Sequence, residues 1–89
     1  MKLLLCCECQ DVTKLLSQDR GCRCGKSHGK YVTDKVVEVT GPCEVLGLDN
    51  NTLDHGVTTL DQHPHGGPPV LAWVIPRGNP RVRRVSGGR

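Results

Sequence analysis

Large apolar side chains are scarce in this sequence of 89 residues, which contains no Phe and one each of Trp, Tyr and Met. Burial must therefore come mainly from Val and Leu, and this favours short β-strands over a helical bundle. The 11 Gly and 6 Pro divide the chain into short runs between turns. A chain of this length is only marginally stabilised by its core, so a further staple is expected. We predict a small β-rich single domain, all-β or α+β, over residues 1–89.

Long hydrophobic runs are also missing. Three leucines precede the first cysteine, whereas an export signal needs about 7–15 apolar residues. The longest later run, VLAWVI, is far shorter than the roughly 18 residues of a membrane span. We therefore expect no membrane contact and a cytoplasmic location. In a reducing compartment, clustered cysteines bind metal more often than they form disulfides.

Basic residues are absent from residues 46–76, and acidic residues are absent from residues 77–89. The net charge of +3 is therefore concentrated in a C-terminal segment that holds Arg77, Arg81, Arg83, Arg84 and Arg89. Such a segment suits phosphate groups or an acidic partner. It is equally typical of a solvated terminus, and we expect residues 86–89 to form a flexible tail.

Cysteine, in contrast, is abundant, and four of the six cysteines form two close pairs, Cys6 with Cys9 and Cys22 with Cys24. A structural Zn²⁺ takes four tetrahedral thiolate or imidazole ligands, and two tight turns can each present two sulfurs. We interpret residues 1–35 as a zinc-ribbon half that holds one structural Zn²⁺ at these four cysteines. Redox-active thiols and disulfides are the alternatives.

The neighbours of the two pairs support a metal site. Gly25 follows the second pair, where the turn favours a residue that tolerates positive φ. Cys7 can compete with Cys6 or Cys9 as a ligand, and we expect it to point away from the metal. Basic side chains would offset the negative charge of a zinc tetrathiolate. Four lie close to the cysteines in the sequence: Lys2, Arg23, Lys26 and Lys30.

Four segments read LLCCECQDV, RGCRCGKSHGKYVTD, VTGPCEVLGLDN and AWVIPRGNPRVRRV. With its C-x-x-C opening, its C-x-C-G-K pair before G-K-Y, its G-P turn and its V-I-P strand, the chain resembles small uncharacterised zinc-ribbon proteins of bacteriophages and mobile elements. The resemblance implies a zinc site at Cys6, Cys9, Cys22 and Cys24, a phage origin and a location in the host cytoplasm. It implies no activity. Gln10 stands where that family usually has Gly.

Short strands are expected at residues 2–5, 12–16 and 30–33, and residues 36–85 form a β-rich half. Within that half we expect strands at 36–41, 70–76 and 81–85, with residues 70–76 in the centre of the sheet. Alternation in the last strand would place Val82 and Arg83 on opposite faces.

Residues 49–60 predict a short helix with Asn50 or Asn51 as its N-cap. Leu53, Val57 and Leu60 recur at helical spacing, and we expect this face to pack onto the sheet. The loop that follows, residues 61–69, holds His63 and His65. It is either a polar surface loop or part of a second metal site with His55 or Asp61.

Catalytic motifs are absent, including G-x-S-x-G, H-E-x-x-H and a phosphate-binding Gly-rich loop. We expect Cys43 to be a small buried hydrophobe rather than a nucleophile. The chain is therefore expected not to be an enzyme.

Two binding functions fit the sequence. The first is a phage accessory protein that binds a host protein or a small anionic, nucleotide-like ligand and thereby counters host defence. Trp73, expected at the core or in a pocket wall, would act in it with Arg77, Arg81, Arg83 and Arg84. The alternative is a nucleic-acid-binding zinc ribbon, against which the low charge and the scarce aromatics weigh. A structural virion component is a third possibility, and the oligomeric state is left open.

Overall fold

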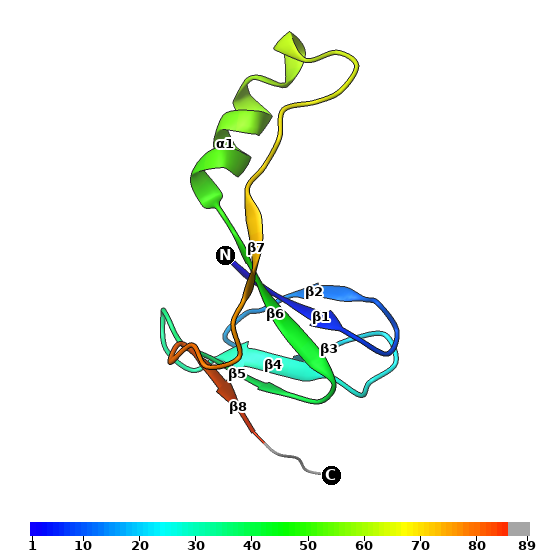
Figure 1. Cartoon of the computed structure of the whole chain (residues 1–89), viewed down its shortest axis with the longest axis vertical. Coiled ribbons are helices and arrows are strands. Elements are labelled where there is room, and N and C mark those ends of the chain that lie inside the picture. The colour runs from blue at the N-terminus through cyan, green and yellow to red at the C-terminus, as the bar shows by residue number, and fades with distance from the viewer. Residues whose placement is uncertain (86–89) are drawn as a thin grey trace.

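The computed structural model describes residues 1–85, which form two four-stranded sheets and one protruding α-helix (Figure 1). The prediction of a small β-rich domain is confirmed. Sheet A has the strand order β2-β1-β6-β7, and sheet B has the order β3-β4-β5-β8. The strands are β1 (Lys2–Cys6), β2 (Val12–Lys14), β3 (Arg20–Gly21), β4 (His28–Tyr31), β5 (Val37–Thr40), β6 (Cys43–Leu48), β7 (Ala72–Ile75) and β8 (Val82–Arg84).

Neighbouring strands are antiparallel except β5 and β8, which run parallel. The cysteine-rich residues 1–35 supply β1 and β2 to sheet A and β3 and β4 to sheet B. In each sheet these strands pair with a strand from the second half of the chain, since β1 pairs with β6 and β4 pairs with β5. The two halves expected from the sequence therefore share both sheets.

A core of aliphatic side chains and one thiol lies between the sheets. Alternate residues of β5 and β6 are buried, as the two-residue period of a strand requires when one face is covered. Cys43 is fully buried, which confirms its prediction as a small hydrophobe. The core comprises Leu4, Leu15, Val37, Val39, Cys43, Val45, Ile75 and Val82.

Trp73 lies outside this core, with 47% of its surface exposed. The prediction that residues 70–76 form a central strand is wrong, because β7 is the edge strand of sheet A. The prediction that Trp73 occupies the core is also wrong, although Ile75 on the same strand does belong to the core. The register places Trp73 opposite Gly47, and the indole lies on the backbone of that glycine. A Cβ at Gly47 would be 2.4 Å from Cε2 of the indole. Trp73 therefore packs against an adjacent strand and not between the sheets.

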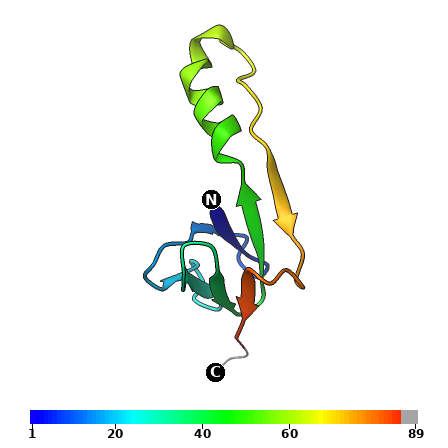
Figure 2. The ribbon, with the colours of Figure 1, turned by 90° about the vertical axis from the view of Figure 1, so that its left-hand side faces the viewer.

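Residues 49–71 form an arm that extends away from both sheets (Figure 2). It contains α1 (Asn50–Thr58) and the 3₁₀ turn η1 (Leu60–Gln62). Asp49, rather than Asn50 or Asn51, caps the helix, since its Oδ2 accepts a hydrogen bond from the Thr52 N–H at 3.1 Å. No helix in residues 1–85 has the length and apolar character needed to cross a membrane.

The helix does not pack on the sheet as expected, because it leaves the end of β6 and points away from the domain. Of the three predicted apolar side chains, Val57 in α1 is 65% exposed and Leu60 in η1 is 57% exposed, whereas Leu53 is half-buried. The buried residue of α1 is Gly56, whose position is next to Pro68 on the returning segment. The arm is therefore stabilised mainly by contacts between the helix and the returning segment, and not by contacts with the sheets.

Strand β8 follows the expected alternation, with Val82 buried and Arg83 exposed. The expected flexible tail, residues 86–89, lies outside the described residues.

Candidate metal centre

Two turns at one end of the domain bring the four predicted cysteines together. The turn after β1 carries Cys6 and Cys9, and the turn after β3 carries Cys22 and Cys24. Their Sγ atoms lie within 4.8 Å of one another, with 3.7 Å between Cys6 and Cys24 and 3.4 Å between Cys22 and Cys24. A tetrahedral ion with bonds of about 2.3 Å separates its sulfurs by about 3.8 Å. All six cysteines are free thiols, so these four can hold a metal ion.

The first turn depends on Gln10, whose backbone has a positive φ of 63°. In this conformation its N–H donates to the Cys6 carbonyl at 2.9 Å, which closes the loop around Cys9. Its side-chain amide donates to the Cys7 carbonyl at 3.3 Å. Glycine is the residue that adopts this conformation without strain. Gln10 therefore occupies a position at which the backbone itself favours glycine.

The second turn has the expected glycine at its bend. Gly25 has a φ of 80°, and its N–H donates to the Cys22 carbonyl at 3.1 Å. The Arg23 N–H donates to Oδ2 of Asp11 at 2.8 Å. Because Asp11 follows the first turn, this bond joins the two cysteine loops directly.

Ser27 connects the protein to two of the sulfurs. It is fully buried, and its hydroxyl lies 3.3 Å from Sγ of Cys6. Its backbone N–H donates to Sγ of Cys22 at 3.4 Å. Donors of this kind stabilise thiolates and orient metal ligands. Sequence reasoning missed Ser27, because a serine three residues after a C-x-C pair has no diagnostic value by itself.

The hydrogen bonds and the crowding of sulfurs move the thiol pKa values apart. The Ser27 hydroxyl and the backbone N–H groups of the first turn lower the pKa of Cys6 to about 6. The Lys26 N–H lowers the pKa of Cys24, but burial and the neighbouring sulfurs outweigh it and raise the value to about 12. One thiolate thus forms readily while another keeps its proton. A divalent cation would displace the remaining protons, so that all four cysteines bind as thiolates.

Charged residues surround the centre unevenly. Lys26 forms an ion pair with Glu8 at 3.2 Å, which links the two cysteine turns, and the nearby Cys24 also raises the pKa of Lys26. Lys2, however, donates from Nζ to the Lys35 carbonyl at 3.0 Å and lies at the opposite end of β1. The expectation that Lys2 neighbours the sulfurs is therefore wrong.

Cys7 is exposed and stands outside the sulfur cluster, as the sequence suggested. Its backbone N–H donates to the Pro42 carbonyl at 2.8 Å, which fixes the first turn to the turn between β5 and β6. Gly41, which precedes that proline, packs directly against Lys26 at the end of the second turn. A Cβ there would lie 2.1 Å from the Lys26 carbonyl oxygen. The metal-binding end is therefore packed against the second half of the chain.

The arginines predicted to bind a ligand are largely paired with carboxylates of the sheets. Nε of Arg77 donates to Glu44 at 3.1 Å, and the hydrogen bond from Arg77 lowers the pKa of Glu44. Arg84 donates to the Cys43 carbonyl at 2.8 Å and forms an ion pair with Glu44 at 3.3 Å. Arg83 lies 3.5 Å from Glu38.

The remaining predicted residues are Arg81 and Trp73. Arg81 is exposed. Burial of Lys2 lowers the pKa of that side chain, and the nearby charge of Arg81 lowers it further. Trp73 lies on β7, and the assignment of these residues to one ligand site stays a prediction.

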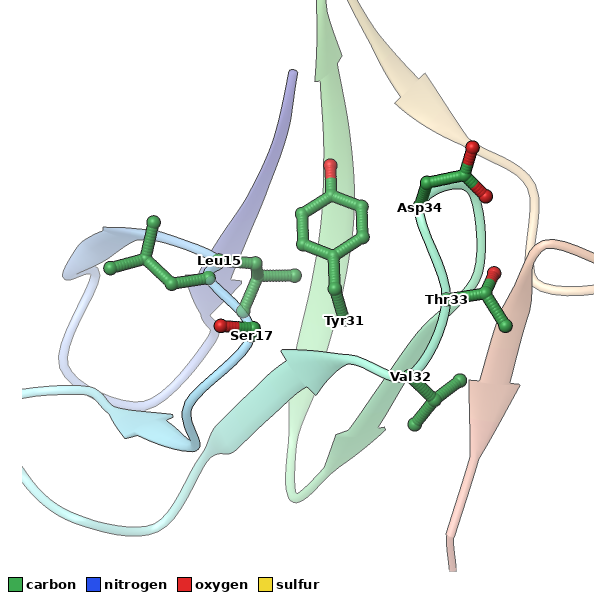
Figure 3. Close-up of a pocket in the computed structure, with 7 residues that line it drawn as sticks. Leu15, Ser17, Tyr31, Val32, Thr33 and Asp34 are labelled. Carbon is green, nitrogen blue, oxygen red and sulfur yellow. The ribbon is translucent and has the colours of Figure 1, made fainter.

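An open cleft of about 520 Å³ lies instead beside the end of β4 (Figure 3). None of the predicted ligand residues lines it. Its floor includes Tyr31, whose hydroxyl accepts a hydrogen bond from the Lys2 N–H at 3.1 Å. The lining carries one carboxylate and no cationic side chain: Leu15, Leu16, Ser17, Tyr31, Val32, Thr33 and Asp34.

The histidines do not form a second metal site. His63 and His65 are exposed in the arm, and among residues 1–85 the four cysteines are the one group of three or more close potential ligands. Comparison of the chain with protein-family models, curated proteins and solved structures finds no match. The phage zinc-ribbon resemblance therefore stays a prediction, and the cysteine geometry is what the site itself establishes.

Proposed function

We propose that this protein is a non-catalytic protein-binding module whose fold is held by one structural Zn²⁺ at Cys6, Cys9, Cys22 and Cys24. Four thiolates fill the tetrahedral shell of zinc and leave no position open for substrate, which is typical of structural sites. Zinc binding contributes on the order of 10 kcal/mol to small zinc domains. Such a contribution suits a core that contains no aromatic ring and has only the partly buried Tyr31 packed against it.

The zinc part of the proposal is tested by elemental analysis of protein purified without chelators. One equivalent of zinc is expected for the wild type and for Cys7→Ser, the matched control with an exposed thiol outside the cluster. Cys9→Ser is expected to lose both the metal and the cooperative unfolding transition. Less than about half an equivalent of zinc in the wild type would contradict the assignment.

The outer face of sheet A carries the binding part of the proposal. The strand registers place aliphatic side chains from all four strands on the face opposite the core. Sheet B covers the other face, and the helix extends away (Figure 1). Lys14 and Glu44 share this face and flank the apolar side chains. An apolar sheet face of this kind marks a protein interaction site. Its members are Val12 on β2, Leu3 and Leu5 on β1, Leu46 and Leu48 on β6, and Val74 on β7.

A protein partner suits these observations better than a nucleic acid or a small anion. Arg77, Arg83 and Arg84 already pair with Glu44 and Glu38, so their charge is partly neutralised. The cleft near Tyr31 offers an anion no cationic lining residue. Single-strand binders also stack bases on several aromatic side chains, and this chain has two.

The binding test starts from capture of partners in an extract of the organism that encodes the chain. A captured protein is then purified and titrated against wild type, Val12→Glu and Val32→Glu. Val12 lies on the outer face of sheet A, whereas Val32 is an equally simple exposed valine in the cleft. Val12→Glu should weaken binding at least about tenfold, since a charge is then desolvated in the interface, while Val32→Glu should bind normally.

Hydrogen exchange of the complex should show protection on β1 and β6. Loss of binding in Val32→Glu alone would move the site to the cleft and overturn the assignment. The proposal would also fail if the chain retained no protein but shifted a nucleic acid in gel electrophoresis at low salt.

A further inference from the structure

Strand β7 leaves one row of backbone groups without a partner. It is the last strand of sheet A, and within residues 1–85 no strand pairs with its outer edge. The Asp49 N–H donates to the Leu71 carbonyl at 2.9 Å, and bonded pairs alternate along an antiparallel ladder. Trp73 and Ile75 therefore bond to β6, whereas the N–H and C=O groups of Ala72 and Val74 point outward. Figure 2 shows nothing beside this edge along its length.

The other three sheet edges are protected in a way that β7 is not. Each carries a basic side chain, Lys14 on β2, Arg20 on β3 and Arg83 on β8, and charged side chains discourage pairing at an edge. The sequence of β7 is AWVI, with no charge, and Val74 is 61% exposed. An uncharged edge strand with exposed apolar side chains is suited to pairing with another strand.

We propose that β7 pairs antiparallel with β7 of a second copy of this chain, about a two-fold axis at Trp73. Ala72 of each copy then faces Val74 of the other, and these two pairs exchange four backbone hydrogen bonds. The two Trp73 residues lie directly opposite each other on the same face of the sheet, and each indole covers Gly47 of its own β6. The two copies of sheet A become one continuous eight-stranded sheet.

The distribution of charge favours a second copy over an unrelated peptide. In a two-fold antiparallel arrangement, the chain before β7 in one copy lies beside the chain after β7 in the other. The segment before β7 belongs to the arm, which includes the exposed Asp54 and Asp61 and holds no Lys or Arg. The segment after β7 begins the basic stretch with Arg77, which already pairs with Glu44, and the exposed Arg81. The acidic arm of one copy thus extends beside the basic segment of the other, and the two copies are complementary in charge.

Pro76 limits the pairing to one short stretch. The outward backbone groups belong to even-numbered residues, so about the proposed axis Pro76 of each copy faces Val70 of the other. Proline cannot donate to a strand ladder, and the regular ladder therefore ends at this pair on both sides. Because the two-fold interface uses the same edge of both copies, a closed pair of molecules is the expected product rather than an open fibre.

Sedimentation equilibrium of the zinc-loaded protein over a concentration series tests the inference. Wild type should form a dimer that dissociates on dilution and weakens as salt is raised, because the complementary charges are screened. Trp73 is the only Trp in the chain, so its fluorescence reports on the interface directly. Acrylamide should quench it less in the dimer than in the monomer.

Ala72→Pro removes an outward N–H that β6 does not use, and it should weaken dimerisation about 10- to 100-fold. Ala72→Thr keeps the N–H and should dimerise like wild type. Trp73→Arg is a second test should Ala72→Pro fail to bind zinc, since it places like charges opposite each other across the axis.

A wild type that stays monomeric at every concentration would overturn the proposal. A dimer that survives Ala72→Pro and Trp73→Arg with zinc bound would overturn it too, because another surface would then hold it. Monomers that instead bind an unrelated extended peptide at β7 would assign this edge to a different partner and refute the second copy.

Discussion

Replacing Ser27 with alanine should weaken zinc binding about 10- to 100-fold while leaving the sheets intact. The hydroxyl lies 3.3 Å from Sγ of Cys6, and Ser27 is fully buried. Water cannot take its place, so the variant loses the bond outright. A hydrogen bond to a charged group contributes about 1.5–3 kcal/mol, and about 1.4 kcal/mol corresponds to a tenfold change in affinity. The backbone N–H that donates to Cys22 remains, so the site itself should persist.

The expected loss depends on pH in a defined direction. The Ser27 hydroxyl is the largest cause that lowers the pKa of Cys6 from 9.0 to about 6. Without it the pKa of Cys6 rises, and zinc must displace a proton that the wild type has already lost. The difference in affinity between variant and wild type should therefore grow as the pH falls from about 9 towards 6.

Competition with a chromophoric chelator measures the affinity at each pH. Ser17→Ala is the matched control, because Ser17 is exposed and lines the cleft, outside the group of four sulfurs. Equal affinity of Ser27→Ala and wild type near neutral pH would refute the reasoning. Complete loss of metal would show that Ser27 is needed for the fold of the turn and does more than donate one hydrogen bond to Cys6.

Three further substitutions test local features. Gln10→Gly should raise the free energy of unfolding by about 1 kcal/mol in urea titrations, because glycine adopts the positive φ without strain; a loss would show that the Gln10 side chain stabilises the turn more than its backbone strains it. Gly47→Ala should displace the indole of Trp73, shift its emission and cost about 1–3 kcal/mol. Asp49→Ala should destabilise α1 by about 1 kcal/mol in hydrogen exchange, with little change in the main unfolding transition.

The metal centre was predictable because its geometry is local. Cys6 with Cys9 and Cys22 with Cys24 are each held by one tight turn, and the spacing of a pair nearly determines the direction of its sulfurs. Ser27 was not predictable in this way. Its hydroxyl reaches Cys6 only because the two hairpins meet, and that contact joins positions 21 residues apart.

The positions of Trp73 and the helix depended on contacts that a single segment does not encode. Hydrophobicity alone favoured Trp73 as a core residue, but Trp73 lies opposite Gly47 and is half-exposed, whereas Ile75 of the same strand is buried in the core. The apolar spacing from Leu53 to Leu60 correctly indicated a helix, although its face meets no sheet. The direction in which β6 leaves sheet A decides this, and neither composition nor periodicity specifies it.

The arm is a part of the chain that can be replaced without changing the two sheets. None of residues 49–71 belongs to the core between the sheets, and the strands on either side already pair, since Leu48 lies opposite Ala72. A short turn joining these two residues should preserve the frame, and a longer insert should be tolerated at the same place. The fold thus offers a natural scaffold for display, in which the two sheets and their cysteine cluster carry an interchangeable loop.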